Sequence, residues 1–366
     1  MRILIPDGSY RLLMQVVYCF SKHKSFEVHV LSDEKHAPMR YSRLVENYKF
    51  IDYTSVSDWL EIIDNYVSEY KIDLILPICE ESTEKLIVHR EQLASKELLV
   101  PLSSFENFKK ATNKVDLAMH LGICGISHPK TKIVKPNSIN EDKFQLDYPV
   151  IAKPSESMDG FGIKYLSNET QLQEFYRCLS KPYVLQEYID GYDVDCSVLC
   201  KDGNVIAYTI QRGILFESRK FSPAIGLEFL EQKEILEIVK KMMASLEWNG
   251  VAHIDLRYDN NAKNFKVIEI NGRFWGSVDA SMAAGLNFPH LYCMLARQKK
   301  IQQIEYAHIK FYNLKGLVAL IKKNPLVLLK GSFINKHTAL PFAVKDPMPL
   351  LVKFIQRTRV LMKKSA

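Results

Sequence analysis

The residues best suited to chemistry in this sequence are two carboxylates, an amide and a guanidinium: Asp255, Glu269, Asn271 and Arg273. The stretches around them alternate apolar and polar residues, which is typical of half-buried strands. A period of two places Glu269, Asn271 and Arg273 on one strand face. The polar run 259–264 has the composition of a turn, so we predict an antiparallel hairpin on which these side chains converge.

Oxygen ligands of this kind favour a hard divalent cation. Mg²⁺, or Mn²⁺ in its place, takes carboxylate and amide oxygens and usually keeps substrate phosphates in its shell. The neighbouring arginine suits a planar anion such as an acyl phosphate. A solvated strand face with salt bridges would use the same residues, and the hairpin alone does not decide between the two interpretations.

A buried lysine and a glycine loop precede the hairpin in the chain. Lys153 ends the apolar run 149–154, so its ammonium group needs either a partner, such as a phosphate, or an exit to water. The following loop 155–162 contains Gly160 and Gly162, whose backbone can approach an anion closely. An ordinary hairpin turn and an edge-strand lysine are the simpler alternatives.

A further strand runs from 184 to 189 and leads into the polar turn 190–193. Exposed backbone groups at such a strand end can bind the edge of an adenine, and a carboxylate a few residues later can bind ribose hydroxyls. Without other evidence, a simple strand and turn is the favoured interpretation.

The elements that must position these residues begin with strand–helix alternation over residues 1–105. Helical patterns at 12–20 and 59–67 lie between short apolar runs, which predicts a parallel sheet with right-handed crossovers. Ligands gather at the carboxyl ends of such strands, here at 7–9 and 79–81. No GxGxxG supports a dinucleotide site. The predicted strands are 2–5, 27–31, 49–52, 73–77 and 97–101.

Composition restricts the class of protein. A chain of 366 residues has room for two or three domains, and 47% hydrophobic and 25% charged residues are ordinary for a globular protein. The seven cysteines form no CxxC, so we expect reduced thiols and a cytoplasmic location. We expect neither a signal peptide nor a membrane-spanning helix, because no apolar run is long enough.

The positive charge is concentrated at the C-terminal end. Residues 301–366 contain ten lysines and two arginines but only two acids, so this segment has a net charge of +10. The whole chain has a net charge of +7, so residues 1–300 have a net charge of −3. These basic residues alternate with aliphatic ones. Peripheral contact with an anionic membrane is one interpretation, and a helix packed on the body is the other. No motif supports a nucleic-acid partner.

The order of these signals resembles the ATP-grasp superfamily, which includes D-alanine–D-alanine ligases, biotin carboxylase and carbamoyl-phosphate-synthetase-like carboxylate–amine ligases. The resemblance covers about residues 1–300. It implies an α/β protein with a Rossmann-like domain at 1–105 and an ATP-grasp domain at 106–300. Within the latter it implies a lid subdomain at 115–190 and a metal-binding subdomain at 191–300. Residues 301–366 would be a basic extension.

The resemblance also implies roles for single residues. Two departures are Asp193, where relatives usually have glutamate, and Gly272, where they often have proline. For ATP the implied contacts are Lys114, Lys153, Ser155, Gly160, Gly162, Gln186, Glu187, Ile189 and Asp193. The implied Mg²⁺ ligands are Asp255, Glu269 and Asn271, and the implied catalytic residues are Arg273, which steadies an acyl phosphate, and Lys153.

The implied activity is a ligase that uses ATP to activate a carboxylate as an acyl phosphate and couples it to an amine of an amino acid, peptide or sugar acid. A bicarbonate or thiol acceptor, or a non-enzymatic ATP-binding regulator at a membrane, are the alternatives. Relatives often dimerise, so a homodimer is expected by analogy. The candidate contacts for small-molecule substrates are Ser9, Glu80, Arg212, Arg219, His253, Arg257 and Ser277.

Overall fold

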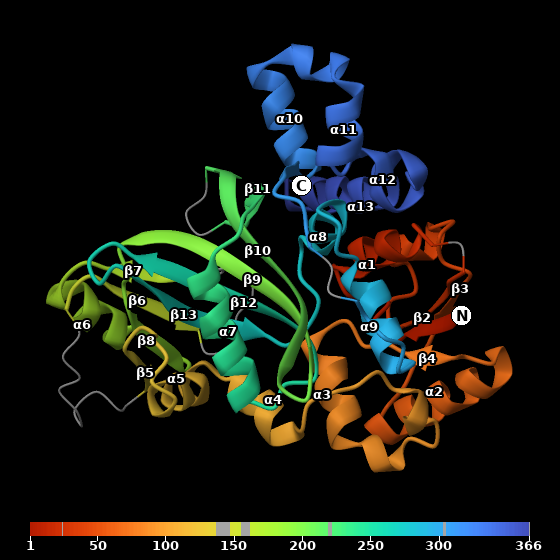
Figure 1. Ribbon diagram of the computed structural model, residues 1–366, viewed down its shortest axis with the longest axis horizontal. Helices are drawn as coiled ribbons and strands as arrows, with labels where there is room; N and C mark the ends of the chain where they lie inside the picture. Colours follow the sequence, from red (N-terminus) through yellow and green to blue (C-terminus); the bar gives the residue numbers. More distant parts are fainter. Residues whose placement is uncertain (24, 137–146, 155–161, 219–221, 303–304, 366) are drawn as a thin grey trace.

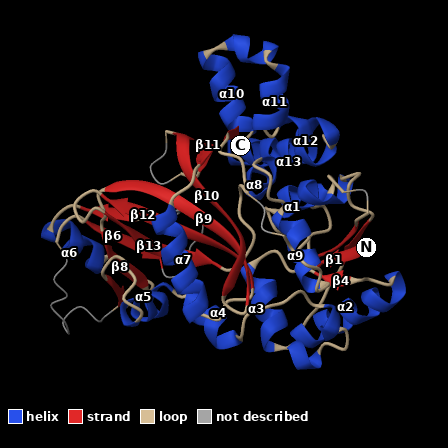
Figure 2. Cartoon of the chain, viewed as in Figure 1, coloured by secondary structure: helices blue, strands red, loops and turns tan. Residues whose placement is uncertain are grey.

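The computed structural model describes residues 1–23, 25–136, 147–154, 162–218, 222–302 and 305–365. Within these ranges the chain folds into three sheets and the helices that cover them (Figures 1 and 2). One sheet is parallel and the other two are antiparallel. The predicted α/β class is therefore confirmed.

The N-terminal sheet has the strand order β3-β2-β1-β4, and all its pairs are parallel. Helices lie on both of its faces, because the strand order runs outward from β1 first to one side and then to the other. The strands are β1 (Arg2–Ile5), β2 (Glu27–Ser32), β3 (Asn47–Phe50) and β4 (Leu74–Ile75). The helices are α1 (Leu13–Phe20), η1 (Pro38–Tyr41), α2 (Val56–Tyr70), α3 (Glu80–Val88), η2 (Arg90–Gln92) and η3 (Lys96–Leu98).

The strand predicted at 97–101 is wrong. The 3₁₀ turn Lys96–Leu98 occupies its first two residues, and within the stretch only Leu99 bridges the parallel sheet, at Ile75. The side chain of Asp64 accepts hydrogen bonds from the backbone N–H groups of Ala94 and Ser95, both at 2.9 Å. These bonds hold the chain in tight turns just before the apolar run, so too few residues are left to form a ladder.

A four-stranded antiparallel sheet follows, in the order β5-β8-β6-β7. Asn113 caps α5, because its Oδ1 accepts from the N–H of Val115 at 2.9 Å, and this cap fixes Lys114 as the first helical residue. The strands are β5 (Thr131–Val134), β6 (Val150–Pro154), β7 (Lys164–Leu166) and β8 (Tyr183–Glu187). The helices are α4 (Phe105–Thr112), α5 (Lys114–Ile123) and α6 (Glu169–Arg177).

The largest sheet is antiparallel, in the order β13-β12-β9-β10-β11-β14. Apolar residues of its inner strands pack against α7 (Lys233–Ser245), which lies across the sheet in Figure 1. Its strands are β9 (Gly191–Lys201), β10 (Asn204–Phe216), β11 (Ala224–Phe229), β12 (Gly250–Asp259), β13 (Asn264–Asn271) and β14 (Lys310–Tyr312). Helices α8 (Val278–Ala283) and α9 (Phe288–Ala296) then pack against α1 of the N-terminal domain.

The last segment of the chain does not stand apart from the body. β14 belongs to the six-stranded sheet although it lies within 301–366. Phe342 stacks on Tyr18 with ring centroids 5.3 Å apart, and Gln356 donates to the His36 carbonyl at 2.8 Å. The helices are α10 (Leu314–Lys323), η4 (Pro325–Leu329), α11 (Gly331–His337), α12 (Leu340–Lys345) and α13 (Met348–Ser365). Among the described residues, no helix is long and apolar enough to cross a membrane.

Candidate functional site

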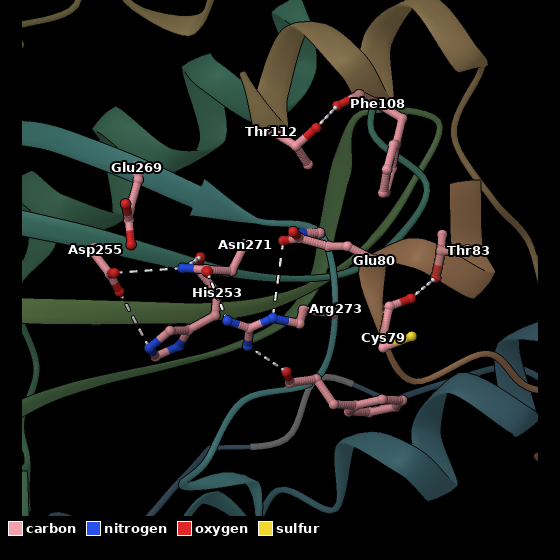
Figure 3. A network of polar contacts seen from close by, with 12 residues as sticks. Cys79, Glu80, Thr83, Phe108, Thr112, His253, Asp255, Glu269, Asn271 and Arg273 are labelled. Atoms are coloured by element: carbon pink, nitrogen blue, oxygen red, sulfur yellow. Dashed lines mark hydrogen bonds and ion pairs between the residues drawn. The ribbon is translucent and has the colours of Figure 1, made fainter. Parts of the chain in front are cut away.

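The hairpin predicted from the sequence is present as β12 and β13. Asp255 lies directly opposite Glu269 in the antiparallel pair, and His253 lies opposite Asn271. The register shifts between Asp255 and Leu256, which marks a bulge beside the two carboxylates. Figure 3 shows these side chains on one side of the hairpin, pointing toward a common space.

Arg273 is held at the end of this hairpin by two oxygen atoms. Its Nη2 donates to Asn271 Oδ1 at 2.9 Å and its Nη1 to the Phe274 carbonyl at 2.9 Å. Glu80, at the start of α3, accepts from the Gly272 N–H at 3.0 Å and lies 3.9 Å from Arg273 Nε. The N-terminal domain therefore contributes a carboxylate to the same site, as Figure 3 shows.

The two predicted lysines enter the site from the neighbouring elements. Lys114 Nζ lies 3.2 Å from Glu269 Oε2, and Lys153 Nζ donates to Gln186 Oε1 at 2.8 Å. The Gln186 amide in turn donates to Thr131 Oγ1 at 3.1 Å, which fixes its carbonyl toward the lysine. Burial lowers the pKa of Lys153, although the nearby acids work in the opposite direction.

The two carboxylates of the hairpin have opposite pKa shifts. Burial would raise the pKa of Glu269, but the positive charges of Lys114 and Lys153 outweigh burial and lower its pKa to about 2. Burial raises the pKa of Asp255, and the negative charges of Glu269 and Asp195 raise it further. The space beside Asp255 therefore has an excess of negative charge.

Asp195 is a member of this site that sequence reasoning missed. It lies on β9 directly opposite Asp255, and ligand atoms of Asp195, His253 and Asp255 all lie within 4.8 Å of one another. Burial, followed by the charge of Asp193, raises the pKa of Asp195 to about 7. The only sequence signal was the alternation Asp193-Val-Asp195 on a strand, which puts both acids on one face.

The donor set fits a hard divalent cation. Carboxylate oxygens of Asp195 and Asp255 converge there. The amide of Asn271 lies beside them, with its Nδ2 donating to Asp255 Oδ2 at 3.4 Å and its Oδ1 accepting from Arg273. Burial, and then the negative charges of Glu269 and Asp195, raise the pKa of Asp255, and a bound cation would stabilise its charged form. His253 is oriented by Ser197, whose Oγ lies 2.9 Å from His253 Nδ1, and burial lowers its pKa to about 3, so it is neutral and adds no repulsion to a cation.

These groups line one cavity of about 580 Å³ between the N-terminal domain and the six-stranded sheet. It is large enough for a small substrate together with part of a nucleotide. The predicted residues that line it are Glu80, Lys114, Lys153, Asp193, His253, Asp255, Glu269, Asn271, Arg273 and Ser277. Lining residues that the sequence analysis did not single out include Arg11, Gln15, Asp195, Gln211, Trp275 and Asp279.

The predicted adenine hinge, residues 186–189, lies beside the cavity, and its residues contact neighbouring residues of the protein. Gln186 binds Lys153 as described above. Glu187 accepts from the N–H of Lys130 at 3.1 Å and pairs with Lys266 at 3.2 Å. Ile189 is buried, and its carbonyl accepts from Arg257. None of the three hinge residues is among those that line the cavity.

Two arginines predicted to contact substrate lie outside the cavity lining. Arg257 donates to the carbonyls of Ile189 at 2.6 Å and Gly191 at 2.8 Å, and it pairs with Asp193. Arg212 pairs with Glu228 at 2.7 Å on the surface. In each case a neighbouring acid already pairs with the guanidinium. Arg257 therefore holds the backbone around Gly191, and Arg212 links β10 to β11.

The glycine loop is only partly described. Ser155, Gly160 and Arg219 lie outside the described residues, and Ser9 is not among the residues that line the cavity. Gly162 has φ +80°, and a Cβ there would lie 2.9 Å from Pro154 Cγ. A glycine is therefore required where the chain returns to β7.

Comparison with known proteins gives a consistent picture. The model of the ATP-grasp domain matches residues 111–277. D-aspartate ligase from Enterococcus faecium is 23% identical over 265 residues, 65% of this chain and 63% of that protein. D-alanine–D-alanine ligase from Anaplasma marginale is 24% identical over 196 residues, 47% of this chain and 57% of that protein. The chain thus aligns with less than two thirds of the length of these relatives.

Solved structures share the fold over a larger part of the chain. N5-carboxyaminoimidazole synthetase from Staphylococcus aureus, complexed with ADP, superposes with a TM-score of 0.70 at 19% identity and covers 88% of this chain and 86% of that one. L-amino acid ligase from Bacillus licheniformis gives 0.60 at 18% identity, with coverages of 81% and 73%. Lys114, Lys153, Asp255, Glu269 and Arg273 lie within the matched segment, whereas Glu80 and Arg11 of the cavity lining lie before it. Residues 111–277 of this chain are therefore an ATP-grasp domain.

Proposed function

We propose that this protein is an ATP- and Mg²⁺-dependent ligase that activates a carboxylate as an acyl phosphate and couples it to an amine, releasing ADP and phosphate. The observation that supports this most is that two lysines, two hairpin carboxylates and Arg273 line one cavity. A protein that only binds ATP has little need for such a complete set of charged groups.

Different residues of the cavity have different roles in phosphoryl transfer. A substrate carboxylate oxygen forms a bond to the γ-phosphorus of ATP while the bond to ADP breaks. Lys114 and Lys153 neutralise phosphate oxygens, and Arg273, already fixed by Asn271, binds the acyl phosphate. The amine then attacks the carbonyl carbon, phosphate leaves with the bonding electrons, and the amine loses a proton. Positioning and charge neutralisation suffice, so no nucleophilic side chain is required.

Asp255, Glu269 and Asn271 would hold Mg²⁺, with Asp195 close enough to support them. A bound Mg²⁺ would neutralise charge on the triphosphate as it transfers its terminal phosphoryl group. Asp193 lines the cavity and would bind the ribose, held in place by Arg257. The backbone at Gln186, Glu187 and Ile189 would bind the adenine.

The test is ADP release in the presence of MgATP and a pool of amino acids, short peptides and sugar acids, with products identified by mass spectrometry. A product mass equal to two substrates minus water establishes the ligase. Parallel pools with bicarbonate or thiols separate these acceptors from amines. If none of the pools stimulates ADP release, the ligase proposal is wrong.

We also propose that the protein is cytoplasmic and that residues 301–366 contact anionic membrane. The apolar side chains of Leu326, Leu328 and Leu329 are 63%, 53% and 81% exposed, next to the basic end of α10 at Lys322 and Lys323. Exposed leucines beside lysines suit the surface of an anionic bilayer. The homodimer stays a prediction, which sedimentation of the full chain would check.

A further inference from the structure

The cavity continues past Arg273 toward α8 and α1, where it is lined by side chains with a different chemistry. Asp279 belongs to α8, Gln15 to α1 and Gln211 to β10, and all three line the cavity. Gln211 and α8 are in direct contact, because Gln211 Nε2 donates to Ser277 Oγ at 2.8 Å. These three residues form what we call the acceptor end of the cavity.

Asp279 is a buried carboxylate without a positive partner. Asp279 is only 7% exposed. Its Oδ1 accepts a hydrogen bond from the N–H of Ala280, the next residue in the helix, at 3.0 Å. It forms no ion pair with any described residue. Burial raises its pKa to about 7, because no positive charge offsets the loss of water. Buried carboxylates are normally paired, so this one is complementary to a cation that the protein itself does not supply.

Gln211 provides a second, independent observation. It is 1% exposed, and its amide group hydrogen-bonds both Ser277 and Asp195, which leaves its carbonyl oxygen Oε1 buried without a partner among the described residues. The Oε1 of Gln15 is also buried without a partner there. A buried acceptor without a hydrogen-bond partner destabilises the folded state. Two such acceptors and an unpaired carboxylate line the same cavity, and this set of groups matches a ligand rich in hydrogen-bond donors.

The unsatisfied atoms near Arg273 have the opposite character. Arg273 Nε and Trp275 Nε1 are buried donors without a hydrogen-bond acceptor in the described structure. Donors suit the electron-rich oxygens of a carboxylate or an acyl phosphate, and acceptors suit an amine. The lining of the cavity thus offers unsatisfied donors at Arg273 and Trp275 and unsatisfied acceptors at Gln211 and Gln15.

We propose that Asp279, Gln211 and Gln15 bind the ammonium group of the acceptor substrate, which is therefore a primary amine that is positively charged at neutral pH. This rests on the proposed ligase function and names the class of its second substrate. An ammonium group has three N–H donors and one positive charge, which matches one carboxylate and two amide oxygens. The charge of Asp279 repels an anion. A quaternary ammonium has the charge but no donor, so it leaves both amide oxygens unsatisfied.

The experiment observes binding directly. Full-length protein labelled with ¹⁵N at tryptophan gives an indole signal for Trp275, which lines the cavity and is assigned with W275F. Propylammonium chloride is titrated, with tetramethylammonium chloride at equal ionic strength as the matched probe. We expect a saturable shift with propylammonium only. In D279N its dissociation constant rises at least about tenfold, and D279E restores part of the binding. Glu228→Gln, a charge change outside the cavity, leaves the constant unchanged.

Three results overturn the proposal: no saturable shift in the wild type, an equal dissociation constant in D279N, or equal binding of tetramethylammonium. The titration needs no turnover, so its outcome is independent of the ligase proposal. If the pools release no ADP but propylammonium binds as expected, the ammonium site stands and the ligase reaction fails. If amines are ligated and D279N leaves the KM for the amine unchanged, the reaction stands and the ammonium site fails.

Discussion

The two ends of the cavity hold their charges in different ways. At the hairpin, Glu269 is paired with Lys114, and Arg273 is fixed by Asn271 before any ligand is present. At the acceptor end, the hydrogen-bond partner of Asp279 within the described part of the chain is one backbone N–H, that of Ala280. The paired groups are preorganised for a reaction that develops charge. The unpaired carboxylate is destabilising by itself, and such a group is retained where a ligand completes it.

The largest expected effect concerns the paired end. In Glu269→Gln the charge that neutralises Lys114 and Lys153 disappears together with a carboxylate ligand. We expect ATP-dependent product formation to fall by at least about 10³-fold, because several interactions with the triphosphate are lost together. ADP release is the measurement, and E228Q is the matched control on the surface. Turnover within tenfold of the wild type would remove Glu269 from the mechanism.

A smaller effect is expected at Arg257, which holds the carbonyls of Ile189 and Gly191 and the carboxylate of Asp193. In Arg257→Met this segment loses its charged anchor, and the KM for ATP should rise by about tenfold, the value of one charge-assisted hydrogen bond. The KM values for both other substrates should stay the same. A rise confined to the acceptor would instead return Arg257 to the substrate role that the sequence predicted.

The buried carboxyl group of Asp279 should make the free energy of unfolding depend on pH. The folded pKa of Asp279 is about 7 and its ordinary value is 3.8, so between these values the folded state binds more protons than the unfolded state. Its contribution to stability therefore falls as pH rises through this window. The variant Asp279→Asn cannot ionise at this position and so does not lose this stability as pH rises. We expect the variant to be more stable than the wild type by about 2 kcal/mol at pH 8.

Urea denaturation of both proteins measures this difference at pH 5 and at pH 8. The advantage of the variant should shrink at the lower pH, where the wild-type carboxyl group is protonated in the folded state. If the difference in unfolding free energy between the two proteins does not change with pH, Asp279 has a positively charged partner in the folded state. Both ends of the cavity would then hold paired charges.

The smallest effect concerns the surface outside the cavity. A variant with Leu326, Leu328 and Leu329 changed to serine keeps every described ion pair but loses the exposed apolar edge of η4. We expect it to be retained about tenfold less than the wild type by vesicles containing anionic lipid at low salt. Deleting 301–366 would be a poor test, because it removes β14 from the sheet. Equal retention of both proteins would reject membrane contact.

The sequence predicted the hairpin because its chemistry is local: the ligands lie on two strands joined by a short turn. The alternation at 193–195 placed Asp195 on a strand face but could not bring it to Asp255, because the two meet only through the pairing of β9 with β12, strands far apart in the chain. The same limit explains the two arginines. A sequence shows that Arg212 and Arg257 are cations, but only the structure shows that Glu228 and Asp193 already bind them.

The position of β14 has a consequence for how the protein is made. Phe311 and Asn313 line the cavity, and β14 pairs with β11 at Leu227 and its neighbours. A nascent chain therefore emerges from the ribosome with every lysine, acid and arginine of the ATP-grasp domain before the wall of its cavity can close. Synthesis has to pass residue 313 before the last wall residue is available, so the order of translation itself delays the assembly of the complete site.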